Sequence, residues 1–110
     1  MTKDVSIGGV VVPMCATALA PIQFRNVFGE DLIALAQKYA DDFTTGAYEV
    51  YAKLGFIFAK RAEGADFSKI QLSDFEEWLE QFDFLDVCEA AGDIATLYTT
   101  SSKGSVTPKK

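Results

Sequence analysis

Apolar and polar residues at the start of the chain follow the pattern of a β-hairpin. The segment DVSIGGVVVPMC is apolar on both sides of Gly8-Gly9, a dipeptide that supplies the positive φ angles of a two-residue turn. We expect short strands over 4–7 and 10–15, with Pro13 at an edge or bulge because proline donates no ladder hydrogen bond. A lone hairpin is marginal in water, so the helices that follow must support it.

The hydrophobic spacing then becomes helical, beginning with PIQFRNVFGEDL. Pro21 suits the first position of a helix and Gly29 suits the left-handed residue that ends one, which predicts a short helix. Its expected buried side consists of Ile22, Phe24, Val27 and Phe28. Glu30 and Asp31 then place acids at the positive end of a second helix. Helical spacing is followed there by Leu32, Ile33, Leu35, Ala36 and Tyr39.

A third helix is predicted from Thr44 or Thr45, either of which can cap it, to about Ala62. Its apolar stripe runs through Ala47, Tyr51, Leu54 and Phe58. We expect this helix to be the longest and to form the centre of the core. Gly55 inside it costs about 1 kcal/mol relative to alanine, which indicates that a neighbouring backbone comes close there.

Two further helices complete the pattern. Ser73 and Glu76 have the S-x-x-E spacing of a capping box, and the amphipathic positions behind it are Phe75, Trp78, Leu79 and Phe82. Asp83 can cap a last helix that ends near Thr99, with an apolar side of Phe84, Val87, Cys88, Ala91, Ala95 and Tyr98.

The pattern as a whole predicts an α+β fold that is mostly helical, with an N-terminal β-hairpin packed on about five short helices. Residues 1–99 should form a single globular domain, since a chain of 110 residues with 49% hydrophobic residues buries one core. Residues 100–110 are small, polar and basic, so we expect a flexible, disordered C-terminal tail.

Charge is distributed unevenly along the chain. The net charge is −6, and no basic residue lies between Ser73 and Asp93. We expect a solvated, solubilising acidic face formed by Glu76, Glu77, Glu80, Asp83, Asp86 and Glu89. The chain has no basic groove for phosphates, which argues against nucleic-acid binding.

Few residues are suited to catalysis or to metal binding. The sequence has no histidine, which removes Ser/His and Cys/His pairs and every zinc or di-iron pattern that needs one, and it has no glycine-rich phosphate loop. Cys15 and Cys88 lie far apart in apolar surroundings, as is typical of reduced, buried thiols. Glu76 and Glu80 are one helical turn apart, but they lack an E-x-x-H partner and the spacing of an EF-hand loop. We expect no enzyme activity, no cofactor and no metal.

The longest apolar run extends from Gly8 to Ala20 and is interrupted by Pro13. It is shorter than the roughly 20 residues that cross a bilayer. The start MTKDVSIGG carries Asp4 beside Lys3 and does not match a secretory signal. The sequence therefore predicts a cytoplasmic protein that does not insert into membranes.

Aromatic residues are abundant for a domain of this size, with nine Phe, four Tyr and one Trp. Core packing accounts for most of them. The others are expected to form an exposed apolar surface, which usually marks a protein partner. The best candidates for partner binding are Phe75, Trp78, Leu79 and Phe82, because a short helix with several large apolar residues offers a groove or fills one.

Three motifs in this order resemble a known family. They are PIQFRNVFGEDL at 21–32, FIFAK at 56–60 and FEEWLEQF at 75–82. From Val5 to Tyr98 the chain resembles the tail assembly chaperones of long-tailed, siphovirus-type bacteriophages and of prophages of Gram-positive bacteria. One departure is Ala20 before Pro21, where a capping Ser or Thr would be more favourable by about 1 kcal/mol.

The resemblance implies a non-enzymatic protein that binds the tape measure protein, keeps this long helical rod soluble and helps to recruit tail tube subunits to it. Such proteins are typically absent from the mature virion. The family commonly produces a longer form by ribosomal frameshifting near the end of the reading frame, and Lys109-Lys110 would suit an A-rich slippery site.

Two other classes of function remain open at this point. A structural tail component retained in the virion, such as a connector or tube-end protein, could also be small, acidic and self-associating. An acidic decoy that blocks a DNA-binding protein would use the acidic run and would bind a basic partner in a salt-sensitive way. Excess apolar surface favours homo-oligomers as much as it favours a different partner.

Overall fold

The chain begins with a two-stranded antiparallel hairpin. The computed structural model describes the backbone of residues 2–41 and 43–106 and the side chains of residues 2–41 and 43–100. Strands β1 (Thr2–Ile7) and β2 (Val10–Cys15) pair with Ile7 opposite Val10, and Gly8 and Gly9 form the turn with φ angles of 60° and 85°. The predicted hairpin is confirmed, with a first strand that starts two residues earlier than expected. Pro13 lies on the exposed side of its edge strand.

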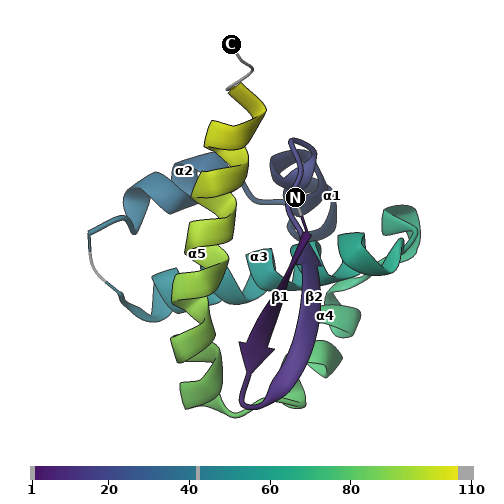
Figure 1. Ribbon diagram of the computed structural model, residues 1–110. Helices are drawn as coiled ribbons and strands as arrows, with labels where there is room; N and C mark the ends of the chain where they lie inside the picture. Colours follow the sequence, from purple (N-terminus) through teal and green to yellow (C-terminus); the bar gives the residue numbers. More distant parts are fainter. Residues whose placement is uncertain (1, 42, 107–110) are drawn as a thin grey trace.

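The hairpin is supported by helices, because one of its faces carries apolar side chains that water cannot accommodate cheaply. Its buried residues are Val5, Ile7, Val12 and Met14. β2 packs mainly against α3 (Thr45–Glu63), and β1 packs against α5 (Phe84–Val106). In Figure 1, α3 crosses behind both the hairpin and α5.

Two short helices follow the hairpin, α1 (Ala20–Phe28) and α2 (Leu32–Lys38). Gly29 ends α1 with φ 70°, and the Asp31 carboxylate caps α2 by accepting a hydrogen bond of 3.1 Å from the Ala34 N–H. The prediction that Ile22 lies on the buried side of α1 is wrong, since it is about half exposed. Ile22 and the fully buried Phe24 are two positions apart, and such residues do not share a helix face.

Helix α3 forms the centre of the core. Thr44 caps it, with its hydroxyl oxygen 3.4 Å from the Ala47 nitrogen, and residues 52–59 are all buried. The close neighbour at Gly55 is a side chain and not the predicted backbone. A Cβ atom on Gly55 would lie 2.8 Å from Cδ1 of Ile94 in α5, so the glycine lets these two helices approach.

A 3-10 turn (Phe67–Lys69) leads into α4 (Leu72–Glu80). The predicted capping box of Ser73 and Glu76 is wrong, because the N-cap of the helix lies two residues earlier than expected. The Asp74 carboxylate instead reaches back to accept a 2.9 Å hydrogen bond from the Gln71 N–H. Gln71 is therefore the N-cap residue.

Helix α5 is longer than the sequence predicted. It spans 23 residues against 19 for α3, and its backbone continues past the expected end near Thr99 to Val106. The last part of the predicted tail, 107–110, lies outside the described residues. Within the described part of the chain, none of the helices combines the length and apolar character required to cross a membrane. The predicted architecture, a hairpin packed on five helices, is confirmed.

Candidate protein-binding surface

Three of the four side chains predicted to bind a partner, Phe75, Trp78 and Phe82, belong to a chain of aromatic rings packed against the core. We call Phe28, Phe56, Phe75, Trp78 and Phe82 the aromatic cluster. Successive ring centroids lie 5.1–5.6 Å apart along Phe28–Phe75, Phe75–Phe56, Phe56–Trp78 and Trp78–Phe82. These edge-on contacts join α1, α3 and α4.

Phe75 is only 7% exposed, and Trp78, Leu79 and Phe82 are partly buried against the core. The prediction that these residues supply the exposed apolar surface is therefore wrong for Phe75 and met only in part by the other three. The physical reason is that the apolar side of α4 faces α3. The amphipathic spacing of these residues therefore reflects packing inside the fold. A role for these residues in partner binding stays a prediction.

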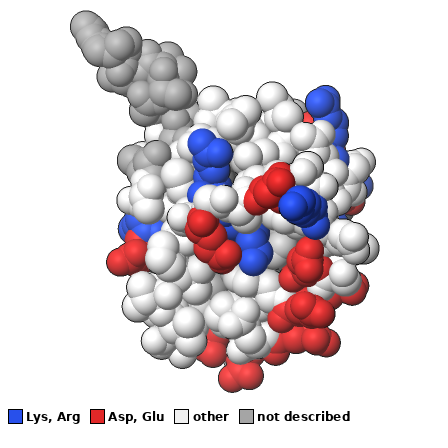
Figure 2. Space-filling model, turned by 90° about the vertical axis from the view of Figure 1, so that its right-hand side faces the viewer, with Lys and Arg blue, Asp and Glu red and all other residues white. Residues whose placement is uncertain are grey.

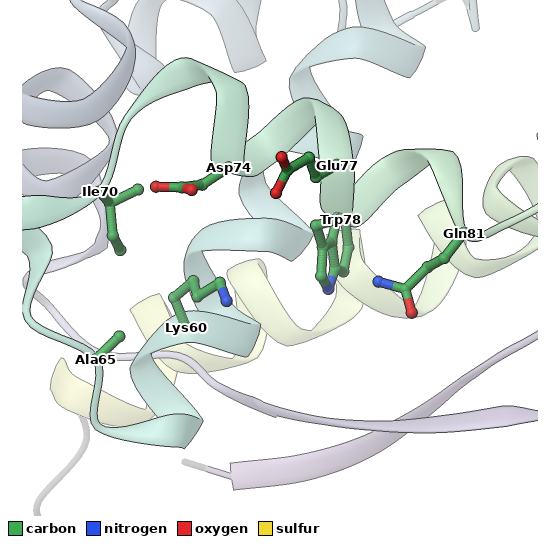
Figure 3. Close-up of a pocket in the computed structure, with 7 residues that line it drawn as sticks. All are labelled: Lys60, Ala65, Ile70, Asp74, Glu77, Trp78 and Gln81. Atoms are coloured by element: carbon green, nitrogen blue, oxygen red, sulfur yellow. The ribbon is translucent and has the colours of Figure 1, made fainter.

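A hollow of about 420 Å³ lies beside the aromatic cluster (Figure 3). Lys60 extends from α3 toward α4, which carries Asp74, Glu77 and Trp78 on the facing side. The Lys60 Nζ atom lies 3.4 Å from a Glu63 carboxylate oxygen and 5.6 Å from the Phe56 ring, while Asp74 caps α4. Because the cation and this carboxylate already have partners, the hollow does not present a free acid–base pair.

The exposed large apolar residues lie elsewhere, at Val10, Val11, Leu19, Ile22, Ile33, Phe43, Leu72, Phe84 and Leu85. Phe43, Phe84 and Leu85 are 54%, 61% and 70% exposed; Phe43 lies just before α3, and Phe84 and Leu85 are the first two residues of α5. The Phe84 ring contacts that of Tyr48, with centroids 4.9 Å apart. We call Phe43, Tyr48, Phe84 and Leu85 the α3–α5 patch. The sequence placed Phe84 on the apolar side of its helix but did not predict this exposure.

Three residues of the α3–α5 patch, Phe43, Tyr48 and Phe84, line a hollow of about 380 Å³. Its lining consists of Phe43, Thr44, Thr45, Tyr48, Phe84 and Cys88, none of which carries a formal charge at neutral pH. Burial raises the pKa of the Tyr48 hydroxyl, and the nearby Cys88 thiol adds to the rise. Cys88 and Cys15 are free thiols and are half-buried, less covered than the sequence predicted. The hollow is thus apolar with a few hydroxyl groups.

The predicted acidic face is exposed as expected at Glu76, Glu77, Glu80, Asp83 and Glu89. Figure 2 shows acidic side chains gathered along the lower right and bottom of one face, below the scattered Lys and Arg side chains. Asp86 is the exception, since it is partly buried against the hairpin turn. A Cβ atom on Gly8 would collide with its carboxylate, so this turn requires glycine for space as well as for its φ angle.

Sequence reasoning missed one charged group inside the fold. Lys53 has a side chain that is 9% exposed, and its Nζ atom lies 2.7 Å from Glu30 and 2.8 Å from Glu49. Burial lowers the pKa of Lys53, but the hydrogen bonds and charges of the two carboxylates outweigh this and raise it above its usual value. The Glu49–Lys53 spacing of four residues could have been found in the sequence, whereas Glu30 is brought in by the turn between α1 and α2.

In the residues that the structure describes, Cys, Asp and Glu side chains do not gather in groups of three or more that could hold a metal ion. Comparisons of the chain with protein-family models, with curated proteins and with solved structures show no match. The surface features that bear on function are the exposed α3–α5 patch and the exposed acids Glu76, Glu77, Glu80, Asp83 and Glu89.

Proposed function

We propose that this chain is a tail assembly chaperone of a long-tailed bacteriophage or prophage, which binds the tape measure protein, keeps it soluble and helps to recruit tail tube subunits. The observation that carries the proposal is the α3–α5 patch, where two phenylalanines and a leucine are more than half exposed and the Phe84 ring contacts that of Tyr48. Exposed groups of this kind usually mark protein-binding sites. The tape measure protein is proposed as the partner because the three sequence motifs resemble those of this family.

The mechanism follows from apolar surface and charge. A tape measure protein is a long chain with repeating apolar stripes, which would aggregate before tube subunits surround it. Several copies of a small chaperone could cover these stripes, each inserting one apolar patch. The exposed acids of α4 and α5 would then face water and keep the coated rods apart by like-charge repulsion.

The proposal includes a setting. The protein acts in the host cytoplasm, is absent from the mature virion, and makes and breaks no covalent bond. Its partners are the tape measure protein and the tail tube protein, with self-association of the chain as a further expectation. It uses neither nucleic acid nor membrane as a partner, in keeping with its net charge of −6.

Co-expression tests the proposal. The tape measure protein encoded beside this chain should be insoluble alone and soluble when the two are produced together, as measured by the soluble fraction after centrifugation. Reversing two exposed acids of α4, Glu76→Lys and Glu80→Lys, should lower that fraction. The matched control reverses Asp4 and Glu63, which are exposed elsewhere, and should lower it less.

An unchanged tape measure solubility on co-expression would contradict the proposal. Equal losses from both reversed pairs would show that net charge acts and that the α4 face has no special role. Mass spectrometry of purified virions separates the second candidate, because a structural tail component would be found in the particles and a chaperone would not.

A further inference from the structure

The α3–α5 patch has the size and chemistry of a receptor for apolar side chains. Its hollow of about 380 Å³ lies at the small end of the roughly 300–1,000 Å³ of ligand pockets and suits one or two large side chains. Two of its lining residues, Phe43 and Phe84, are exposed apolar groups, and the exposed Leu85 follows Phe84 in the chain. The Thr44 hydroxyl already accepts the capping hydrogen bond of α3, so it is committed to the fold.

The exposed charges next to the lining residues in the chain are acidic. Asp41 precedes Phe43, Asp83 precedes Phe84 and Glu89 follows Cys88, and all three are exposed. The sequence has no basic residue in 41–49 or 83–89. Lys53, the next cation along α3, is paired with Glu30 and Glu49. An apolar hollow with acids on its flanks is complementary to a partner that combines large apolar residues with Lys or Arg.

A second copy of this chain fits the patch poorly. Two such patches would bring acidic flanks together, and like-charge juxtaposition opposes the contact. The basic C-terminal residues Lys103, Lys109 and Lys110 are accompanied by a single large apolar residue, Val106, which is too little to fill the hollow. The complementary occupant is therefore a segment of another protein.

We infer that the α3–α5 patch is the docking site for an amphipathic helical segment that places apolar side chains in the hollow and Lys or Arg side chains beside the surrounding carboxylates. Such a segment presents anchors at i, i+3, i+4 and i+7, the usual mode of a helix in a groove. The assignment of this segment to the tape measure protein rests on the proposed function. The apolar and basic character expected of the segment is argued from the site alone.

The site is tested with a fluorescently labelled Leu/Lys peptide of about 18 residues, long enough to become helical when bound. Anisotropy measured against the full chain at about 0.15 M salt gives its dissociation constant. The Leu/Lys peptide should bind more tightly than a Leu/Glu peptide of the same pattern and than an Ala/Lys peptide of the same charge. This result would show that both the apolar and the basic residues of the peptide contribute to binding.

Variants locate the binding. The double substitution Phe84→Ser and Leu85→Ser should weaken Leu/Lys binding by at least about 10-fold, because it removes the two most exposed apolar side chains of the patch. The control, Ile22→Ser and Ile33→Ser, removes two apolar residues on α1 and α2 that are each about half exposed, and it should change binding by less than about 2-fold. Leu85→Ser alone, at the most exposed of these positions, should give a smaller loss in the same direction and guards against misfolding of the double variant.

Three results would overturn the inference: equal weakening by both pairs of substitutions, tight binding of the Leu/Glu peptide, or dimers of the chain that compete with the peptide. Co-expression with the tape measure protein then separates the two proposals. If Phe84→Ser/Leu85→Ser keeps the tape measure soluble as well as the unmodified chain does, the function stands and the docking site is wrong. If the peptide binds at the patch but the tape measure stays insoluble, the docking site stands and the function is wrong.

Discussion

The aromatic cluster and the α3–α5 patch both consist of large apolar residues, but the cluster is packed inside the fold and the patch is exposed to water. In the cluster, Phe56 meets three rings edge-on and is completely buried. In the patch, the Phe84 ring meets one ring among the described side chains, that of Tyr48, and Phe84 is 61% exposed. The cluster has already gained the free energy of leaving water, whereas the patch has not.

This difference explains why the two regions should respond differently to mutation and to partners. Burying a large apolar side chain is worth about 1.5–3 kcal/mol, and that free energy stabilises the fold when the burial is internal. When the side chain stays exposed, the same free energy is available to a binding partner. The cluster should therefore govern stability, and the patch should govern association.

The largest effect is expected from Phe56→Ala, which removes the ring that contacts Phe28, Phe75 and Trp78. It should reduce the free energy of unfolding by about 3–5 kcal/mol, measured by urea denaturation, because it leaves a cavity at the centre of the cluster. Phe84→Ala is the matched control and should cost less than about 1 kcal/mol. Similar losses from both would break the distinction between the two regions.

The sequence predicts local structure well where the cause is local. Gly8-Gly9 fixed the hairpin turn, Gly29 the end of α1 and Thr44 the start of α3, each through its own backbone or hydroxyl group. It could not rank Phe75 against Phe84, because both lie near the start of an amphipathic helix. Which of them is buried depends on how α3 and α1 meet α4, and that is a tertiary property.

The candidate site was missed for the same reason. The exposed acids were predictable from a run without bases, but the hollow joins residues of two segments, 43–48 and 84–88, that are far apart in the chain. No periodicity connects them. Lys53 shows the same limit, since Glu49 is its helical neighbour and Glu30 reaches it only through the fold.

The next effect concerns the ion pair that supports the cluster. Lys53 lies 5.0 Å from the Phe28 ring centroid and ties α3 to the turn after α1. Lys53→Met should lower the free energy of unfolding by about 1–2 kcal/mol, less than for a fully buried pair because Glu30 and Glu49 remain in contact with water. Urea denaturation at neutral pH measures it.

The pH dependence of the free energy of unfolding provides the control for Lys53→Met. Because the folded pKa of Lys53 is raised, its contribution is fully present below the unfolded pKa and is lost as pH rises through the folded value. The stability difference between the unmodified chain and Lys53→Met should thus shrink above about pH 10.4. Tyr48 and Tyr98, whose pKa values are raised mainly by burial, occur in both proteins and cancel in that difference. A constant difference from pH 7 to 11 would contradict the assignment.

A smaller effect on stability is expected at Thr44, which caps α3 and lines the hollow. Thr44→Ala removes the hydroxyl that accepts the Ala47 N–H bond, and it should cost about 0.5–1 kcal/mol, the lower part of the usual range, because that bond is long at 3.4 Å. Thr44→Ser keeps the acceptor and should restore most of the loss. Equal destabilisation by both would mean that the Thr44 methyl group, and not the cap, matters.

The smallest effect on stability should come from Leu85→Ser, at the most exposed residue of the α3–α5 patch. Since its side chain makes little contact in the folded chain, we expect a change within about 0.5 kcal/mol and an unchanged dependence on urea concentration. Peptide binding, by contrast, should weaken, so stability and association would separate at a single residue. A loss of about 2 kcal/mol or more would instead mean that the start of α5 belongs to the core. The apolar surface available to a partner would then lie among the other exposed apolar residues, on the hairpin, α1, α2 and the start of α4.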